Sequence, residues 1–74
     1  METLGTRIKE TRERQLMTQA DLANAAGVAL ITVNRLENDA VESPRPSTIK
    51  RLAAALGISP QWLRFGDDDL KIAA

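Results

Sequence analysis

The sequence contains no cysteine and no histidine. The absence of cysteine excludes disulfides, thiolate nucleophiles and cysteine-ligated metal sites. The absence of histidine removes the commonest metal ligand and the usual general base at neutral pH. The remaining residues provide no pair of carboxylates, nucleophile or phosphate-binding loop that can be assigned to a pocket. We therefore expect a protein that is not an enzyme and that uses no metal, cofactor or small-molecule ligand.

Long hydrophobic runs are absent as well. The N-terminal stretch METLGTRIKE has no apolar segment of the kind that marks a secretory signal. No run approaches the roughly 18 apolar residues that a membrane-spanning helix requires. The sequence therefore predicts a soluble, cytoplasmic protein without membrane contact. Its 74 residues are enough for one small domain.

An excess of charge of either sign is also lacking, since ten basic residues balance ten acidic ones. The distribution is uneven, because three aspartates follow one another at positions 67–69. A basic cluster near the start of the chain comprises Arg7, Lys9, Arg12 and Arg14. Residues 1–66 carry nine basic and seven acidic residues, a net charge of about +2. This weak positive charge lowers the expectation of nucleic-acid binding but does not exclude it.

Apolar residues recur three or four positions apart along most of the chain, and no segment alternates with the period of two typical of a strand. The pattern predicts an all-α fold, a compact five-helix bundle in residues 1–66. Residues 67–74 form a short tail that is first acidic and then apolar. The helices are expected at Thr3–Arg14, Thr18–Ala26, Ala29–Asn38 and Ser47–Leu56, and from Ser59 to the terminating Gly66.

The expected helix ends carry capping residues. Thr18 is placed as an N-cap with Asp21 three residues later, a weaker form of the capping box, and Gly27 is placed to end that helix. A Ser-Pro pair opens the last helix. Ala29 offers no side-chain cap to the helix that follows it, at a cost of about 1 kcal/mol.

Two of the expected helices, Thr18–Ala26 and Ala29–Asn38, are joined by the short turn AGVA. Because this joint is short, the two helices are expected to cross steeply. Two helices joined in this way form a helix-turn-helix, and the second of them can lie in the major groove of DNA.

The faces of the second of these helices can be assigned from spacing. Val33 and Leu36, three positions apart, mark its inward stripe. Leu30 and Ile31, in its first turn, either belong to the core or project past its edge. The polar side chains expected on the outer face are Thr32, Asn34 and Arg35.

Two charged residues lie on inward stripes. Arg12 follows Ile8 by four residues, and Glu37 follows Val33 by four. Because an inward charge is costly unless it is paired, we expect an Arg12–Glu37 ion pair that joins the first and third helices. Removing one partner of a fully buried pair should cost about 3–5 kcal/mol.

A further set of residues occurs in the order and spacing of a known family. It comprises Gln19, Leu22, Ala23, Gly27, Val28, Val33, Leu36, Glu37 and Asn38, then A-x-A-L-G-I-S, and Trp62-Leu63. This set resembles the phage-repressor type of helix-turn-helix, the Cro-like or xenobiotic-response-element family, over residues 3–66. The resemblance implies a lambda-repressor-like fold whose third helix is the recognition helix.

The resemblance also implies which residues contact DNA. Contacts with the DNA backbone are expected at the start of the second helix, contacts with bases along the third, and contacts with phosphates after it. The residues at these positions are Thr18, Gln19, Ala29, Leu30, Ile31, Thr32, Asn34, Arg35, Asn38 and Arg45.

The first turn of the expected recognition helix departs from the family pattern. It has Ala-Leu-Ile-Thr where polar side chains are usual. Leu30 and Ile31 cannot hydrogen-bond a base edge, but they can pack on thymine methyl groups, which leaves polar recognition to the outer face. In the loop before the fourth helix, Glu42 would repel a phosphate. These departures put the affinity for DNA in doubt, but not the fold.

Two functions fit these features. The first is a sequence-specific DNA-binding transcription regulator, a homodimer on a palindromic operator, with recognition helices about 34 Å apart. The candidate dimer-interface residues are Trp62, Arg64, Phe65, Leu70 and Ile72. The alternative is an interaction module of the antirepressor or antitoxin type that binds little or no DNA. Leu30 and Ile31 would then dock a protein partner.

Overall fold

A computed structural model describes residues 2–66 of the chain, and within this range the regular secondary structure is helical. The five helices are α1 (Leu4–Arg14), α2 (Gln19–Ala26), α3 (Leu30–Glu37), α4 (Pro46–Leu56) and α5 (Pro60–Phe65). The predicted all-α, five-helix class is confirmed. The expected tail at residues 67–74 lies outside the described residues.

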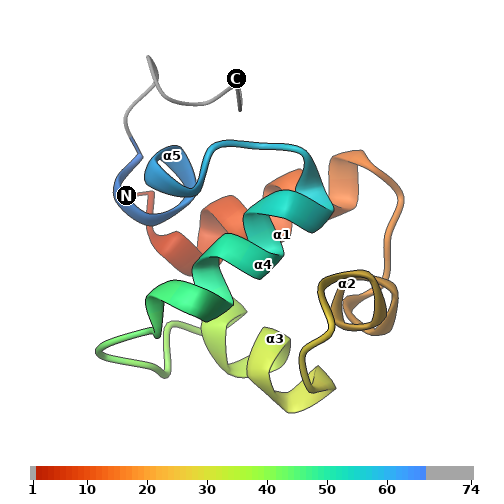
Figure 1. Ribbon diagram of the computed structural model, residues 1–74, viewed down its shortest axis with the longest axis horizontal. Helices are drawn as coiled ribbons and strands as arrows, with labels where there is room; N and C mark the ends of the chain where they lie inside the picture. The colour runs from red at the N-terminus through yellow and green to blue at the C-terminus, as the bar shows by residue number, and fades with distance from the viewer. Residues whose placement is uncertain (1, 67–74) are drawn as a thin grey trace.

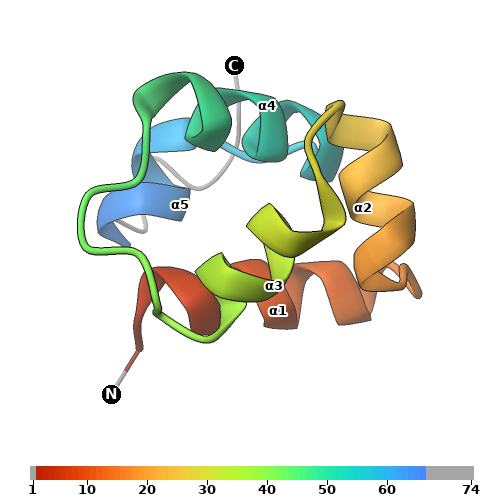
Figure 2. The same cartoon turned by 90° about the horizontal axis from the view of Figure 1, so that it is seen from below.

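The helices enclose one core (Figure 1). α3 packs on α2 and α1, α4 packs on α2 and α5, and α5 also packs on α1. Figure 2 shows α5 between α4 and α1, with α3 and α2 closing the other side. This arrangement leaves one side of α3 without a neighbouring helix.

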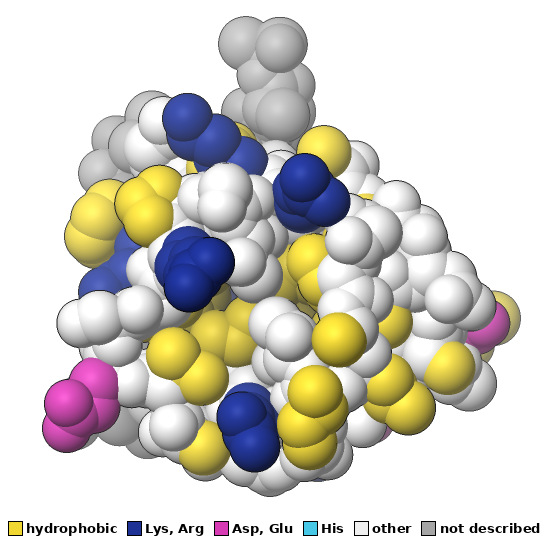
Figure 3. Space-filling view, turned by 60° about the horizontal axis from the view of Figure 1, so that its bottom comes forward, with side chains coloured by type: hydrophobic (Ala, Val, Ile, Leu, Met, Phe, Trp, Pro, Cys, Tyr) yellow, Lys and Arg dark blue, Asp and Glu magenta, His cyan; other side chains and the backbone are white. Residues whose placement is uncertain are grey.

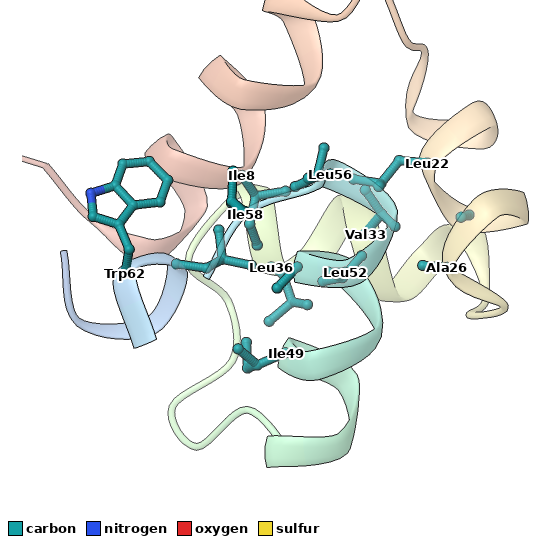
Figure 4. Packing of buried hydrophobic residues seen from close by; sticks show 13 residues of the cluster. Ile8, Leu22, Ala26, Val33, Leu36, Ile49, Leu52, Leu56, Ile58 and Trp62 are labelled. Atoms are coloured by element: carbon teal, nitrogen blue, oxygen red, sulfur yellow. The ribbon is translucent and has the colours of Figure 1, made fainter. Parts of the chain in front are cut away.

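The core consists of thirteen buried hydrophobic residues drawn from every helix (Figure 4). Its largest fully buried side chains are Ile8, Leu22, Leu52, Leu63 and Val33. All of them lie on stripes that the sequence places inward, because apolar residues three or four apart share one face of a helix. Trp62 also lies in this core, with 6% of its surface exposed.

The helix ends agree with the expected caps, with small shifts. Thr18 and Asp21 form a complete capping box, with Asp21 N donating to Thr18 Oγ1 (3.0 Å) and Thr18 N donating to Asp21 Oδ2 (2.9 Å). The bond from the Thr18 amide lowers the pKa of Asp21. α4 begins at Pro46, one residue earlier than expected, because proline suits the first helical position.

The start of α1 is fastened to the end of α3 by contacts that sequence reasoning missed. Asp39 accepts hydrogen bonds from Gly5 N (3.1 Å) and Thr3 Oγ1 (2.8 Å). A Cβ on Gly5 would lie 2.5 Å from Leu36 O, so the two helices meet backbone to backbone. Thr3 is the N-cap of α1 and not its first residue.

Two of the four residues of the N-terminal basic cluster are buried, and only Lys9 and Arg14 are exposed. Arg7 is buried, and it donates from Nε to Leu63 O (2.8 Å) and from Nη2 to Arg64 O (2.9 Å) at the end of α5. Arg12 is buried too. Arg7 follows Leu4 by three residues, which was the available signal for its position beside the core.

Candidate nucleic-acid interface

The turn between α2 and α3 sets the direction of α3. Gly27 adopts a left-handed conformation (φ 69°) that ends α2, and Val28 N then donates to Ala23 O (3.0 Å). Arg51 on α4 donates from Nη1 to Gly27 O (3.2 Å). The turn is therefore held from both α2 and α4, and α3 leaves it at a fixed angle.

The predicted Arg12–Glu37 ion pair is present and joins α1 to α3. Arg12 Nε lies 2.6 Å from Glu37 Oε2, and Nη2 lies 3.0 Å from Oε1, which makes the contact bidentate. Nη1 donates to Met17 O (2.7 Å). The hydrogen bonds with Glu37 raise the pKa of Arg12 against the opposing effect of burial. Both side chains are nearly enclosed, at 10% and 3% exposed.

A chain of amide hydrogen bonds runs outward from this pair. Gln19 Nε2 donates to Glu37 Oε1 (3.0 Å), and Asn34 Nδ2 donates to Gln19 Oε1 (3.4 Å). Asn38 Nδ2 in turn donates to Asn34 Oδ1 (3.4 Å). The side chain of Asn34 is half-buried, so it faces α2 as well as solvent. The buried carboxylate thus orients the polar side chains at the edge of the α2–α3 surface.

The first turn of α3 carries two exposed hydrophobic side chains. Leu30 is 51% exposed and Ile31 is 52% exposed. The possibility that they are ordinary core residues is therefore wrong, and they project past the edge of the core. Of the other expected contact positions on or beside α3, Thr32 is half-buried, and the exposed ones are Ala29, Arg35, Asn38 and Arg45.

A groove of about 320 Å³ lies beside α3, between this helix and the segment leading into α4. The hydroxyls of Thr32, Ser43 and Thr48 and the side chain of Arg45 line it. Sequence reasoning named Thr32 and Arg45 but missed the other two. Hydroxyl and guanidinium groups are the donors that usually contact DNA phosphates.

The second half of the fold carries positive charge that no acidic residue of that half balances. Residues 43–66 contain no acidic residue. Their basic residues are Arg45, Lys50, Arg51 and Arg64. Figure 3 shows basic and hydrophobic side chains interspersed on the face that brings α3 forward, with acidic ones at its edge. The sequence expectation had assigned the main positive cluster to residues 7–14.

The expected dimer-interface residues fall into three groups. Phe65 is 74% exposed, and the Arg64 guanidinium lies 5.3 Å from the centroid of its ring. Trp62 is a core residue with 6% of its surface exposed, so little of it is available to a partner, and its place in a dimer interface stays a prediction. Leu70 and Ile72 lie outside the described residues.

None of the described helices is both long and apolar enough to cross a membrane. Two short helices joined at a left-handed glycine, the second of them exposed along one side, define a helix-turn-helix protein. A family model described as Helix-turn-helix (HTH_3) matches residues 8–63. The chain therefore belongs to the helix-turn-helix family, and the predicted resemblance is confirmed.

Several curated proteins are similar to this chain. HTH-type transcriptional repressor RghR of Bacillus subtilis is 37% identical over 88% of this chain and 48% of its own length. HTH-type transcriptional regulator PrtR of Pseudomonas aeruginosa is 35% identical over 89% of this chain and 25% of its own. The chain thus spans half or less of the length of these relatives. The expectation of a non-enzymatic protein agrees with a family of transcriptional regulators.

Solved structures share the fold. The P22 c2 repressor in complex with synthetic operator 9T has a TM-score of 0.83 at 30% identity, covering 90% of this chain and 100% of that one. The N-terminal DNA-binding domain of SinR from Bacillus subtilis has a TM-score of 0.78 at 28% identity, over 81% of this chain and 87% of that one.

Proposed function

We propose that this protein is a sequence-specific DNA-binding transcription regulator that places α3 in the major groove. The observation that carries the proposal is the exposed outer face of α3, held in a fixed orientation by the Arg12–Glu37 pair and by the Gly27 turn. A rigidly held helix is what base recognition requires. The P22 c2 repressor, solved with its operator, has this arrangement of helices and supports the proposal. A cytoplasmic location follows from this function.

The chemistry of α3 suggests how bases are recognised. Leu30 and Ile31 offer apolar surface to thymine methyl groups. Arg35 is exposed one turn later and can donate two hydrogen bonds to guanine. Thr32 lies between them and can bond either a base or a phosphate. We therefore expect an operator half-site that combines thymines with a guanine.

The phosphate contacts are expected on either side of α3. Thr18 and Gln19 lie at the start of α2, and Gln19 is held in place by Glu37. Asn38 and Arg45 lie beyond the end of α3, and Arg45 lines the groove. Two such units in a homodimer would contact half-sites about 34 Å apart on a palindromic operator.

Selection from a randomised duplex pool, followed by affinity measurements across salt concentrations, tests this function. We expect a palindromic motif and a log–log salt slope of roughly −0.9 per phosphate neutralised. Failure to enrich any motif, together with a flat slope, would overturn the proposal.

Arg35→Ala tests the assignment of a base contact. We expect loss of preference at one position of each half-site, with affinity for the selected motif reduced by about 1–3 kcal/mol. Lys9→Ala removes the same charge from the exposed surface of α1 and serves as the matched control. If Arg35→Ala leaves the motif unchanged, Arg35 contacts no base.

A second candidate function has its own supporting observation. The exposed Leu30–Ile31 pair forms an apolar patch, and the neighbouring loop carries the exposed Glu42, which is unfavourable near phosphate. Such a patch can dock a partner protein as readily as a thymine methyl. The selection experiment separates the two, because an interaction module would enrich no motif.

A further inference from the structure

A second hollow lies away from the α3 surface, between the start of α4 and α5. It encloses about 210 Å³, and most of its lining is apolar. Three prolines (Pro44, Pro46 and Pro60) line it together with Ile49 and Phe65. We call this hollow the α4–α5 pocket. Phe65 lies at the edge and is 74% exposed, so the apolar lining of the pocket continues onto its ring.

The rim of the α4–α5 pocket is positively charged. Lys50 and Arg64 line it, and the Arg64 guanidinium lies over the Phe65 ring. No carboxylate occurs between residues 43 and 66 to balance them. An apolar floor with a positive rim fits an occupant that carries an apolar side chain next to carboxylates.

The chain itself contains a segment of this chemistry. Asp67, Asp68 and Asp69 are its one run of consecutive acidic residues, and Leu70 and Ile72 follow directly. Two copies that met through their positive rims alone would repel each other. The acidic run supplies the charge that such a contact lacks.

We propose that the α4–α5 pocket binds residues 67–72 of a second copy of this chain. Leu70 enters the apolar pocket, and the three aspartates pair with Lys50 and Arg64. This inference rests on the proposed homodimer and names its interface. In a two-fold arrangement each copy gives one segment and receives one, so the contact closes at two chains.

The exit of the chain from α5 favours a second copy over the same one. Gly66 lies against Arg7 of α1, whose Nη1 would be 2.8 Å from a Cβ at that position. Figure 2 shows that α5 separates α1 from α4. The end of α5 at Gly66 therefore lies on the side facing α1, whereas the pocket lies on the side facing α4.

A charge-exchange experiment in the full chain tests this interface without DNA. The first variant reverses the rim (Lys50→Glu with Arg64→Glu), and the second reverses the segment (Asp67→Lys, Asp68→Lys and Asp69→Lys). Each variant alone opposes like charges, whereas a mixture of the two restores both contacts. The matched control reverses two exposed charges on α1, Glu10→Lys with Glu13→Lys.

Sedimentation gives the dimer dissociation constant of each sample. We expect the parent and the control to dimerise alike, each variant to dimerise at least about tenfold more weakly, and the equimolar mixture to form a heterodimer. Raised salt should weaken the parent dimer, because rim charges are screened.

Three results would overturn the proposal: a parent that stays monomeric up to about 1 mM, variants that dimerise as the parent does, or a mixture that stays monomeric. The last result is the one expected if the segment folded back on its own chain. Because no DNA is present, these failures are distinct from a failure to select an operator. Leu70→Ala should weaken the parent dimer without altering its dependence on salt.

Discussion

Residues 2–42 contain charges of both signs, several of them bonded within the protein, whereas residues 43–66 contain only basic residues. In the first region Arg7 holds the end of α5, Arg12 holds Glu37, and Asp39 holds the start of α1. In the second region Arg45 and Lys50 lie exposed at the surface. The sequence is neutral overall. Some of its charged residues nevertheless bond within the protein and hold the fold together, whereas the basic residues Arg45 and Lys50 lie at the surface.

The comparison implies that charge changes in the two regions should affect different properties. Removing a bonded charge of the first region should lower the free energy of unfolding, whereas removing an exposed basic residue, in the second region or at Arg35, should alter binding.

Glu37→Ala should have the largest effect on stability. It leaves the Arg12 guanidinium buried without its carboxylate and also releases Gln19. We expect the free energy of unfolding in urea to fall by about 3–5 kcal/mol. Lys50→Ala, in the second region, should change it by less than about 0.5 kcal/mol.

The double variant Arg12→Met with Glu37→Leu removes both charges of the pair. It therefore tests whether the loss in Glu37→Ala comes from leaving the Arg12 charge buried and unpaired. Apolar side chains of similar size need no partner, so this variant should be more stable than Glu37→Ala. A loss with Lys50→Ala equal to that with Glu37→Ala would contradict the division between the two regions.

Gly5→Ala comes next in size. Its Cβ would lie 2.5 Å and 2.6 Å from the carbonyl oxygens of Leu36 and Glu37, so α1 and α3 must move apart. We expect a loss of about 1–3 kcal/mol by chemical denaturation, together with weaker DNA binding because α3 shifts. Gly57→Ala is the control, since a Cβ there has nothing within 4 Å and meets only the cost of its left-handed conformation. Equal binding by the two variants would mean that the α1–α3 contact does not position α3.

The sequence predicted contacts within a helix and contacts between the inward stripes of two helices. It missed contacts made by the backbone of one helix with a segment far away in the sequence. Arg12 and Glu37 could be paired because each lies four residues beyond a core residue. Gly5 and Asp39 could not, because their contact joins a backbone amide to a carboxylate 34 residues away and leaves no periodic signal. The exposure of Leu30 and Ile31 depends on where the neighbouring helices end, which spacing does not specify.

Leu16→Gly should stabilise the protein. Leu16 adopts a left-handed conformation (φ 58°) after α1 and leaves 92% of its surface exposed, so its side chain gains little from packing. Glycine adopts this conformation without the steric cost, and we expect a gain of about 1 kcal/mol in thermal or urea unfolding. Leu16→Ala removes the apolar side chain but keeps the Cβ, so it should show no such gain. A gain of the same size from alanine would assign the effect to the exposed side chain and not to the backbone.

The smallest expected effect concerns Asp21, an exposed charge of the first region that is nevertheless bonded. Its bond with the Thr18 amide lowers its pKa below the ordinary 3.8. A lowered pKa in the folded state means that the carboxylate stabilises the fold above pH 3.8, and that this contribution disappears as the pH falls through the folded-state pKa. The melting temperature of Asp21→Asn should therefore lie below that of the parent at pH 7, and the gap should close toward pH 2.

Glu10→Gln, also exposed but on α1, should show no comparable gap. A gap that stays constant down to pH 2 would mean that the side-chain shape, and not the charge of the cap, stabilises α2. A closing gap would show that charges of the first region contribute through specific bonds even where they are not buried.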